Sequence, residues 1–135
     1  MLKIAILGAS GYTGLELLRI LANHPSAEVV KATSRQYKGQ GIGAAFPFLK
    51  GYYGNLCFSD PAQYKSTRAD VVFCALPHGA SQEVVPEILD SSAKVIDLSA
   101  DFRLTDENTY TEWYGVHKAP ELLEKAVYGL PELNR

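Results

Sequence analysis

Three glycines at intervals of three residues follow an apolar run near the N-terminus: Gly8, Gly11 and Gly14. This spacing is typical of a strand that passes through a tight turn into a helix. Gly8 allows the backbone to leave the strand sharply, Gly11 allows it to approach a phosphate, and Gly14 lets the helix sit close to the strand. The helix N-terminus then offers free N–H groups and the positive end of its dipole, which indicates an anion-binding turn.

Hydroxyl side chains inside the same turn, from Ser10 and Thr13, add further donors for an anion. The spacing differs from the commoner Gly-x-Gly-x-x-Gly, and a glycine-rich turn without a ligand is the alternative. The position directly after a first buried strand favours nucleotide binding. No lysine follows the triplet, which excludes a P-loop.

The residues that distinguish NADP from NAD lie at the end of the second predicted strand. About twenty positions beyond Gly14, an NAD-binding fold usually carries an acidic residue that binds the ribose 2′-hydroxyl. This chain reads Thr33-Ser34-Arg35 there, with no acid. A serine hydroxyl and a forked guanidinium suit a 2′-phosphate, so Ser34 and Arg35 favour NADP. The alternative is that Arg35 is a solvated loop residue.

Cys74 and His78 are the residues nearest to a nucleophile and its base. Cys74 lies inside an apolar strand, where a cysteine behaves as a small buried hydrophobe, and nothing nearby in sequence lowers its pKa. We therefore expect no catalytic residue in this chain. Asp101 and Arg103 are two positions apart, and they either pair with each other or face a substrate. The scattered histidines and unpaired cysteines predict no metal site.

Composition narrows the class of protein. The chain has 135 residues, 47% of them hydrophobic, which is enough for one domain with a core. A net charge of −2 argues against a nucleic-acid surface. No apolar run reaches membrane-spanning length, the N-terminus lacks a signal-peptide layout, and two cysteines make no disulfide framework. We expect a cytoplasmic protein without nucleic-acid or membrane partners.

Apolar runs and turn signals alternate along the chain. They predict strands at 3–7, 28–33, 69–75 and 94–98, a final strand and turn over 126–132, a possible strand at 56–58, and helices at about 13–22, 81–89 and within 105–120. Residues 36–54 read as a long loop anchored by aromatics. This order predicts one α/β domain over 1–135, a Rossmann-type doubly wound, mostly parallel sheet with helices on both faces. Ligands bind at the carboxyl ends of such strands, where residues 76–79 and 99–103 lie.

Five segments, taken in order, resemble N-acetyl-gamma-glutamyl-phosphate reductase: 8–14 with 16–17, 33–35, 76–79, 97–104 and 128–132. The resemblance implies the NADP-binding part of an arginine-biosynthesis enzyme. That enzyme reduces N-acetyl-glutamyl 5-phosphate to the 5-semialdehyde with NADPH and releases phosphate, and we expect the full-length protein to be a homo-oligomer. The cofactor-binding residues that it implies are Gly8, Ser10, Gly11, Tyr12, Thr13, Gly14, Ser34, Arg35, Pro77, His78 and Ser99.

The chain departs from the family where the chemistry occurs. The family's nucleophilic cysteine stands in a Gly-Cys-Tyr-Pro-type motif and its catalytic histidine in a later domain, and this sequence contains neither. Cys57 and Cys74 do not match the motif and inherit no role. We expect a fragment that exposes apolar surface, binds NADPH and turns nothing over. The alternatives are a stand-alone NADP-binding sensor or regulatory module, and a doubly wound domain with a vacant site.

Overall fold

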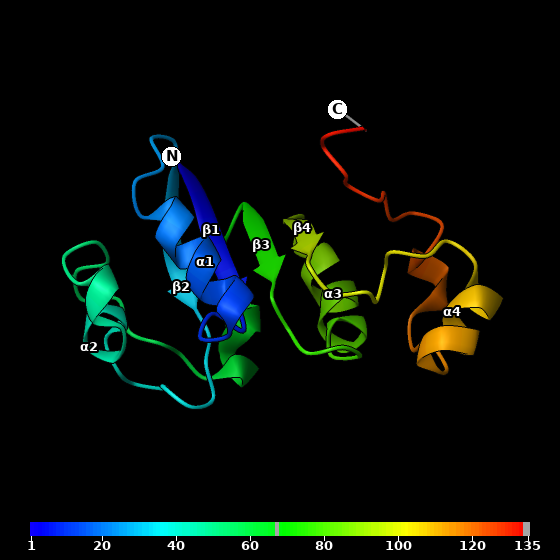
Figure 1. Ribbon diagram of the computed structural model, residues 1–135, viewed down its shortest axis with the longest axis horizontal. Helices are drawn as coiled ribbons and strands as arrows, with labels where there is room; N and C mark the ends of the chain where they lie inside the picture. Colours follow the sequence, from blue (N-terminus) through cyan, green and yellow to red (C-terminus); the bar gives the residue numbers. More distant parts are fainter. Residues whose placement is uncertain (67, 134–135) are drawn as a thin grey trace.

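Four parallel strands form one sheet in the computed structural model, which describes residues 1–66 and 68–133 (Figure 1). The strands are β1 (Leu2–Leu7), β2 (Ala27–Ala32), β3 (Val71–Cys74) and β4 (Lys94–Asp97). The α-helices are α1 (Tyr12–Leu21), α2 (Ile42–Ala45), α3 (Ser81–Leu89) and α4 (Glu107–Tyr114). Short 3₁₀ helices are η1 (Pro47–Leu49), η2 (Pro61–Ser66) and η3 (Pro120–Leu122).

Both faces of the sheet are covered, because alternate residues of a strand point to opposite sides. On one face Ile6 of β1 lies in a buried cluster with Leu18 of α1. On the other face Leu7 shares a cluster with Val85 and Ile88 of α3. This confirms the predicted doubly wound α/β fold with helices on both faces.

The strand order is β2-β1-β3-β4. The chain leaves β1 in one direction to form β2, then crosses back over β1 to form β3 and β4. The carboxyl ends of β1 and β3 therefore flank the point at which the strand order reverses, and ligands of open parallel sheets bind there. All four strands are parallel, so the residues that follow them gather at the carboxyl ends of the strands.

Two glycines have no room for a side chain: Gly8 in the turn between β1 and α1, and Gly14 in the first turn of α1. Gly8 has φ +77°, and a Cβ there would lie 2.3 Å from the carbonyl oxygen of Ala75. A Cβ on Gly14 would lie 2.4 Å from the oxygen of Gly8 and 2.5 Å from the Cα of Ala9. The roles predicted for Gly8 and Gly14, a sharp exit from the strand and close approach of the helix, are confirmed.

Residues 36–54 form the predicted long loop, which includes α2 and η1. Aromatic rings anchor it: Tyr37 contacts Phe46 edge-on with centroids 4.9 Å apart, and Phe46 lies 5.9 Å from Phe58. Phe58 is buried in the cluster that contains β1 and α1. The Tyr53 hydroxyl donates to the carbonyl of Leu18, and burial raises the Tyr53 pKa to about 12. The loop is therefore tied to α1.

Two predicted strands are absent from the described part of the chain. Residues 126–130 have no regular secondary structure and residues 131–132 lie in a turn, and this stretch returns toward the sheet without joining it (Figure 1). Gly129 has no side chain to pack and Pro131 has no N–H to donate, so both disfavour a ladder there. Residues 56–58 make only an isolated bridge between Gly41 and Cys57. No described helix has the length and apolar character needed to cross a membrane.

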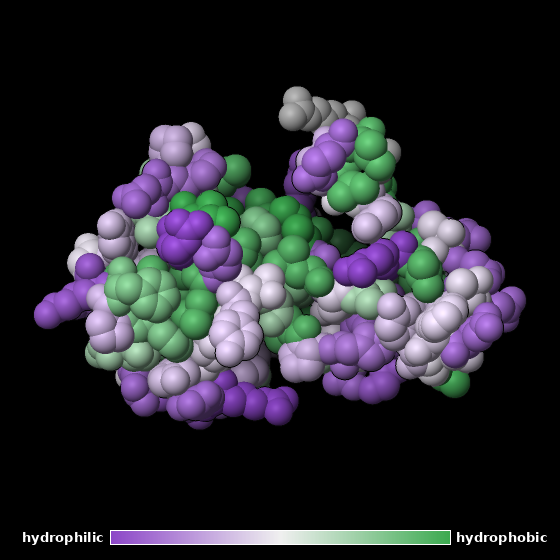
Figure 2. All heavy atoms as spheres, in the orientation of Figure 1, coloured by the Kyte–Doolittle hydropathy of each residue, from purple (hydrophilic) through white to green (hydrophobic). Residues whose placement is uncertain are grey.

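Exposed apolar side chains lie on β4 and directly after it. Ile96 is 43% exposed and Leu98 is 40% exposed. A groove of about 700 Å³ lies between this part of the domain and the C-terminal stretch, where Val127 and Tyr128 contribute to its walls. Figure 2 shows hydrophobic residues around the hollow beneath that stretch.

We predict that Gly14→Ala lowers the free energy of unfolding by about 1–3 kcal/mol, because its Cβ would meet backbone atoms that cannot move aside. Gly11→Ala is the matched control. Gly11 has φ −76°, and its Cβ would meet only the Gly8 oxygen at 3.7 Å. Urea unfolding of both variants measures the difference, and equal stabilities would contradict this account of the turn.

Candidate functional site

The glycine turn is bonded to the carboxyl end of β2. The Gly8 amide donates to Thr33 Oγ1 at 3.1 Å, and the Ala9 amide donates to the Thr33 carbonyl at 2.9 Å. Ser10 Oγ and Ser34 Oγ lie 2.7 Å apart and share a hydrogen bond. The structure therefore brings Ser10 and Ser34 together. Thr33, buried and essential to this arrangement, was not among the predicted site residues.

The N-terminus of α1 can accept an anion. Gly11 is its N-cap with extended torsions, and among the described residues no side chain caps the helix and no acid occupies its first turn. Gly11, Tyr12 and Thr13 are exposed, and the space above Gly11 is open. Free N–H groups at an open helix start fit the pyrophosphate of a dinucleotide. The start of α1 therefore has both the free donors and the open space that a pyrophosphate needs.

Beyond Ser34, two cations surround one carboxylate. Arg35 is exposed, and Lys38 Nζ lies 2.6 Å from Asp60 Oδ2. The hydrogen bond from Lys38 is the largest cause of a lowered Asp60 pKa, with a bond from the Ala62 amide second and the charge of Arg35 a minor cause. The three side chains together carry a net positive charge. Asp60 lies near Lys38 because the neighbouring Ser59 is hydrogen-bonded to Ala32 at the end of β2. The sequence pattern did not predict this bond.

The other side of the glycine turn lies against the carboxyl end of β3. Gly8 contacts the Ala75 carbonyl and approaches the Leu76 side chain. The chain continues directly into Pro77 and His78, which are exposed at the same edge. The predicted residues outside the turn therefore follow three strands: Ser34 and Arg35 follow β2, Pro77 and His78 follow β3, and Ser99 follows β4.

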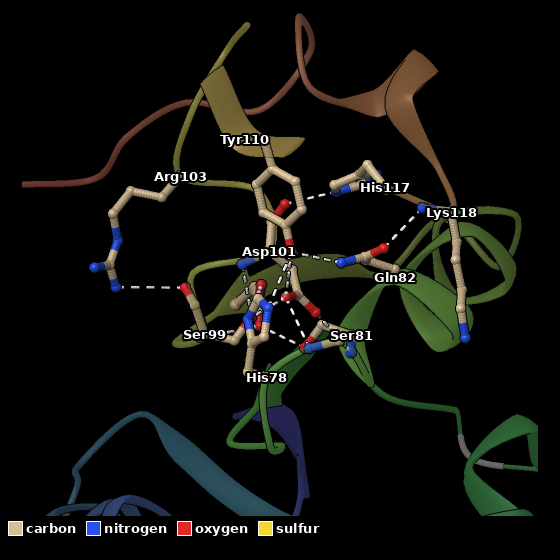
Figure 3. Close-up of polar contacts among 11 residues, drawn as sticks. His78, Ser81, Gln82, Ser99, Asp101, Arg103, Tyr110, His117 and Lys118 are labelled. Carbon is tan, nitrogen blue, oxygen red and sulfur yellow. Dashed lines mark hydrogen bonds and ion pairs between the residues drawn. The ribbon is translucent and has the colours of Figure 1, made fainter. Parts of the chain in front are cut away.

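A buried carboxylate organises the segment after β3 (Figure 3). Asp101 has no exposed surface. It accepts hydrogen bonds from the Gly79 amide at 2.9 Å, the Ser81 amide at 3.1 Å and the Tyr110 hydroxyl at 3.2 Å. His78 Nδ1 lies 3.0 Å from the same carboxylate. Asp101 thus caps the N-terminus of α3 from another part of the chain.

Ser99 is linked to this carboxylate through hydrogen bonds. Its hydroxyl donates to Asp97 at 2.7 Å and accepts from the Asp101 amide at 3.0 Å. Ser81 Oγ also donates to Asp97, at 2.7 Å. The Ser99 hydroxyl is therefore occupied within the protein. Arg103 does not pair with Asp101, contrary to one of the two expectations. Its guanidinium donates to the Ser99 carbonyl at 3.4 Å, because Asp101 is turned inward.

Further partners of the network come from distant segments. Gln82 Nε2 donates to the Tyr110 hydroxyl at 2.7 Å, and Gln82 Oε1 accepts from the Lys118 amide at 2.7 Å. His117 Nε2 donates to the Asp101 carbonyl at 2.7 Å. Burial first, then the charge of Asp101, raises the Tyr110 pKa to about 12. Sequence reasoning missed these residues, because no local pattern marks partners from separate segments.

The two cysteines differ in their exposure. Cys74 is buried at the end of β3, and burial, with a smaller effect of Asp97, raises its pKa to about 12. The prediction that Cys74 is a structural residue is supported. Cys57 is exposed and donates weakly to the Asn55 carbonyl at 3.5 Å. Within residues 1–66 and 68–133, no three His, Cys, Asp or Glu side chains gather as a metal site.

Comparison with known proteins fits this geometry. The chain is 51% identical to N-acetyl-gamma-glutamyl-phosphate reductase of Nitrosococcus oceani and 53% identical to that of Pseudomonas fluorescens strain Pf0-1. In both alignments the whole chain is covered, and it spans 40% of the relative's length. The relative from Desulfotalea psychrophila is 51% identical, with 39% of its length covered.

A solved structure has the same fold. A crystal structure of aspartate semialdehyde dehydrogenase with NADP from Candida albicans superposes with a TM-score of 0.62 at 18% identity, covering 76% of this chain and 31% of that chain. At this identity the likeness concerns the fold alone. The family described as semialdehyde dehydrogenase, NAD binding domain, matches residues 3–135. By that match, and by the glycine turn and parallel sheet described above, the chain belongs to the semialdehyde dehydrogenase NAD-binding domain family.

Proposed function

We propose that residues 1–135 are the NADP-binding domain of a reductase. That enzyme converts N-acetyl-glutamyl 5-phosphate to N-acetyl-glutamate 5-semialdehyde with NADPH, in arginine biosynthesis. The names of the relatives support the substrate and the pathway. The observation that carries the cofactor is the hydrogen bond between Ser10 of the glycine turn and Ser34, the residue directly before the exposed Arg35.

NADP is favoured over NAD by the charges after β2. A 2′-phosphate needs donors and positive charge, whereas a 2′-hydroxyl is usually held by an acid. Arg35 and Lys38 supply two cations, and Asp60 offsets only one of them. Asp60 Oδ2 accepts from Lys38, and its Oδ1 accepts from the Ala62 amide. Arg35, which is exposed, is therefore the main partner proposed for the phosphate.

The strand order sets the direction in which the cofactor extends. We place the adenosine 2′-phosphate after β2, at Ser34 and Arg35, and the pyrophosphate over the start of α1. The nicotinamide half then extends toward β3 and β4. Pro77 and His78 are exposed there and suit contact with it, while Ser99 is half-buried. When bound, the nicotinamide supplies a hydride, and this chain orients it.

The acyl-transfer step needs a residue that this chain does not offer. A cysteine nucleophile attacks as the thiolate, and the raised pKa of Cys74 keeps it protonated at neutral pH. Cys57 follows an irregular segment beyond α2 and has no base within its described contacts. We therefore propose that this chain binds the cofactor and does not itself reduce the acyl phosphate.

We predict that the chain binds NADPH more tightly than NADH in calorimetric titrations. Arg35→Ala should weaken NADPH binding by about 1.5–3 kcal/mol, the contribution of a charged hydrogen bond, and leave NADH binding unchanged. Arg68→Ala is the matched control. Arg68 is an exposed arginine that precedes β3, at the amino-terminal end of the parallel strands and away from the proposed site. Equal binding of the two nucleotides, or equal losses in the two variants, would contradict the NADP assignment.

Gly11→Ala tests the pyrophosphate placement separately. Its stability should stay within about 0.5 kcal/mol of the native chain, because an open extended position accepts a methyl group. Its affinity for both nucleotides should fall, because the methyl group stands where the phosphate approaches. Undiminished affinity for both would show that the phosphates bind elsewhere.

We predict one alkylated cysteine in the folded chain and two after unfolding. Iodoacetamide at pH 8 should modify exposed Cys57 and spare Cys74, whose raised pKa and burial keep the thiol protonated and covered. Mass spectrometry with and without urea reads out both states. In parallel, NADPH oxidation with N-acetyl-glutamyl 5-phosphate should not exceed the rate without protein. Native modification of Cys74, or measurable turnover, would refute the non-catalytic assignment.

A further inference from the structure

We propose that Asp101 is a positioning residue for the nicotinamide half of the cofactor, acting through His78, Gly79 and Ser81. The proposal rests on the cofactor binding inferred above. It assigns a role to a buried carboxylate for which the sequence left two possibilities open, pairing with Arg103 or facing a substrate. It also gives different roles to the N-termini of α1 and α3. The N-terminus of α1 is free for the phosphates, whereas that of α3 is bonded to Asp101.

The first support is the set of contacts that the carboxylate makes. A buried charge is costly unless hydrogen bonds satisfy it. Asp101 accepts from Gly79, Ser81 and Tyr110, and His78 lies against it. Three of these four partners stand within one short segment directly after β3. One carboxylate therefore fixes the path of that segment.

The second support is the exposure of the first part of the segment, before the buried Ser81. Gly79 has φ +86°, and nothing lies within 4 Å of where its Cβ would be. Pro77 and His78 are exposed. The His78 ring contacts the Tyr114 ring at a tilt of 42°, with centroids 4.8 Å apart, which is its closest aromatic contact. Hydrogen bonds to Asp101, more than burial of the segment, thus hold the backbone at its position.

The third support is that further hydrogen bonds fix the backbone and the carboxylate of Asp101. Its amide donates to Ser99 Oγ, and its carbonyl accepts from His117 Nε2. The Tyr110 hydroxyl, which receives a bond from Gln82, donates to its carboxylate. Figure 3 shows these side chains converging on Asp101 from separate elements. A carboxylate fixed on all sides is suited to holding a flexible segment in one geometry.

The fourth support is where the segment lies relative to the proposed cofactor. Gly8, at the pyrophosphate turn, touches the Ala75 carbonyl at the end of β3. A dinucleotide that starts at Ser34 and crosses this turn reaches residues 77–79 with its other half. The free N–H groups of α1 suit the phosphates, whereas the Ser81 amide of α3 is already bonded to Asp101. The segment after β3 therefore faces the nicotinamide half.

The test compares two ligands on the same chain. NADPH has both halves, and adenosine 2′,5′-bisphosphate lacks the nicotinamide half. Asp101→Asn should weaken NADPH binding about tenfold, because an amide accepts fewer and weaker bonds than a carboxylate. It should change adenosine 2′,5′-bisphosphate binding by less than about twofold. Asp106→Asn is the matched control, since Asp106 is an exposed carboxylate that caps α4 through the Thr109 amide. It should leave both affinities unchanged.

Unchanged NADPH affinity in Asp101→Asn, or an equal loss for both ligands, would overturn the proposal. Failure of the native chain to bind either ligand would overturn the proposed function itself, and the proposal with it. If Asp101→Asn does not fold, NMR on the native chain decides. The Gly79 and Ser81 amide resonances should move on titration with NADPH and stay in place with adenosine 2′,5′-bisphosphate. The same shifts with both ligands, or none with NADPH, would reject it.

Discussion

The close approach of backbone to backbone at the β1–α1 turn is the constraint on which the rest of the structure depends. At Gly8 and Gly14 a single added carbon would overlap main-chain atoms. Because the turn is this tight, α1 begins directly beside the switch in strand order and its N-terminus stays open. The contact with Ala75 also sets β3 against the same turn. One local geometry thus places the ends of β1, β2 and β3 at one site.

Local patterns predicted the elements whose signals are local. Apolar runs predicted β1 to β4 to within a few residues, and glycine spacing predicted the turn and the contacts of Gly8 and Gly14. The aromatics of residues 36–54 predicted an anchored loop, because large apolar side chains need burial. The strand at 126–132 was wrong. A segment becomes a strand only when it pairs with a neighbouring strand, and its own sequence does not show whether that pairing forms.

Long-range hydrogen bonds account for most of what the sequence did not predict at the site. Asp101 was expected to pair with nearby Arg103 or to face a substrate. It turns inward instead, because two amides after β3 and the Tyr110 hydroxyl satisfy a buried carboxylate better than one exposed guanidinium does. Thr33 and Asp60 were likewise missed, since their partners come from other segments. All the predicted cofactor contacts stay predictions: Gly8, Ser10, Gly11, Tyr12, Thr13, Gly14, Ser34, Arg35, Pro77, His78 and Ser99.

The open side of β4 has a consequence for how this chain behaves in concentrated solution. Within the described residues, β4 is the last strand of the sheet, and its outer backbone groups face no neighbouring strand. Such an edge is a template for pairing with another chain, and exposed Ile96 and Leu98 make that pairing more favourable. Lys94 is the one basic residue of β4, so charge gives limited protection. Pairing at this edge would leave the carboxyl end of β2, at the other side of the sheet, uncovered.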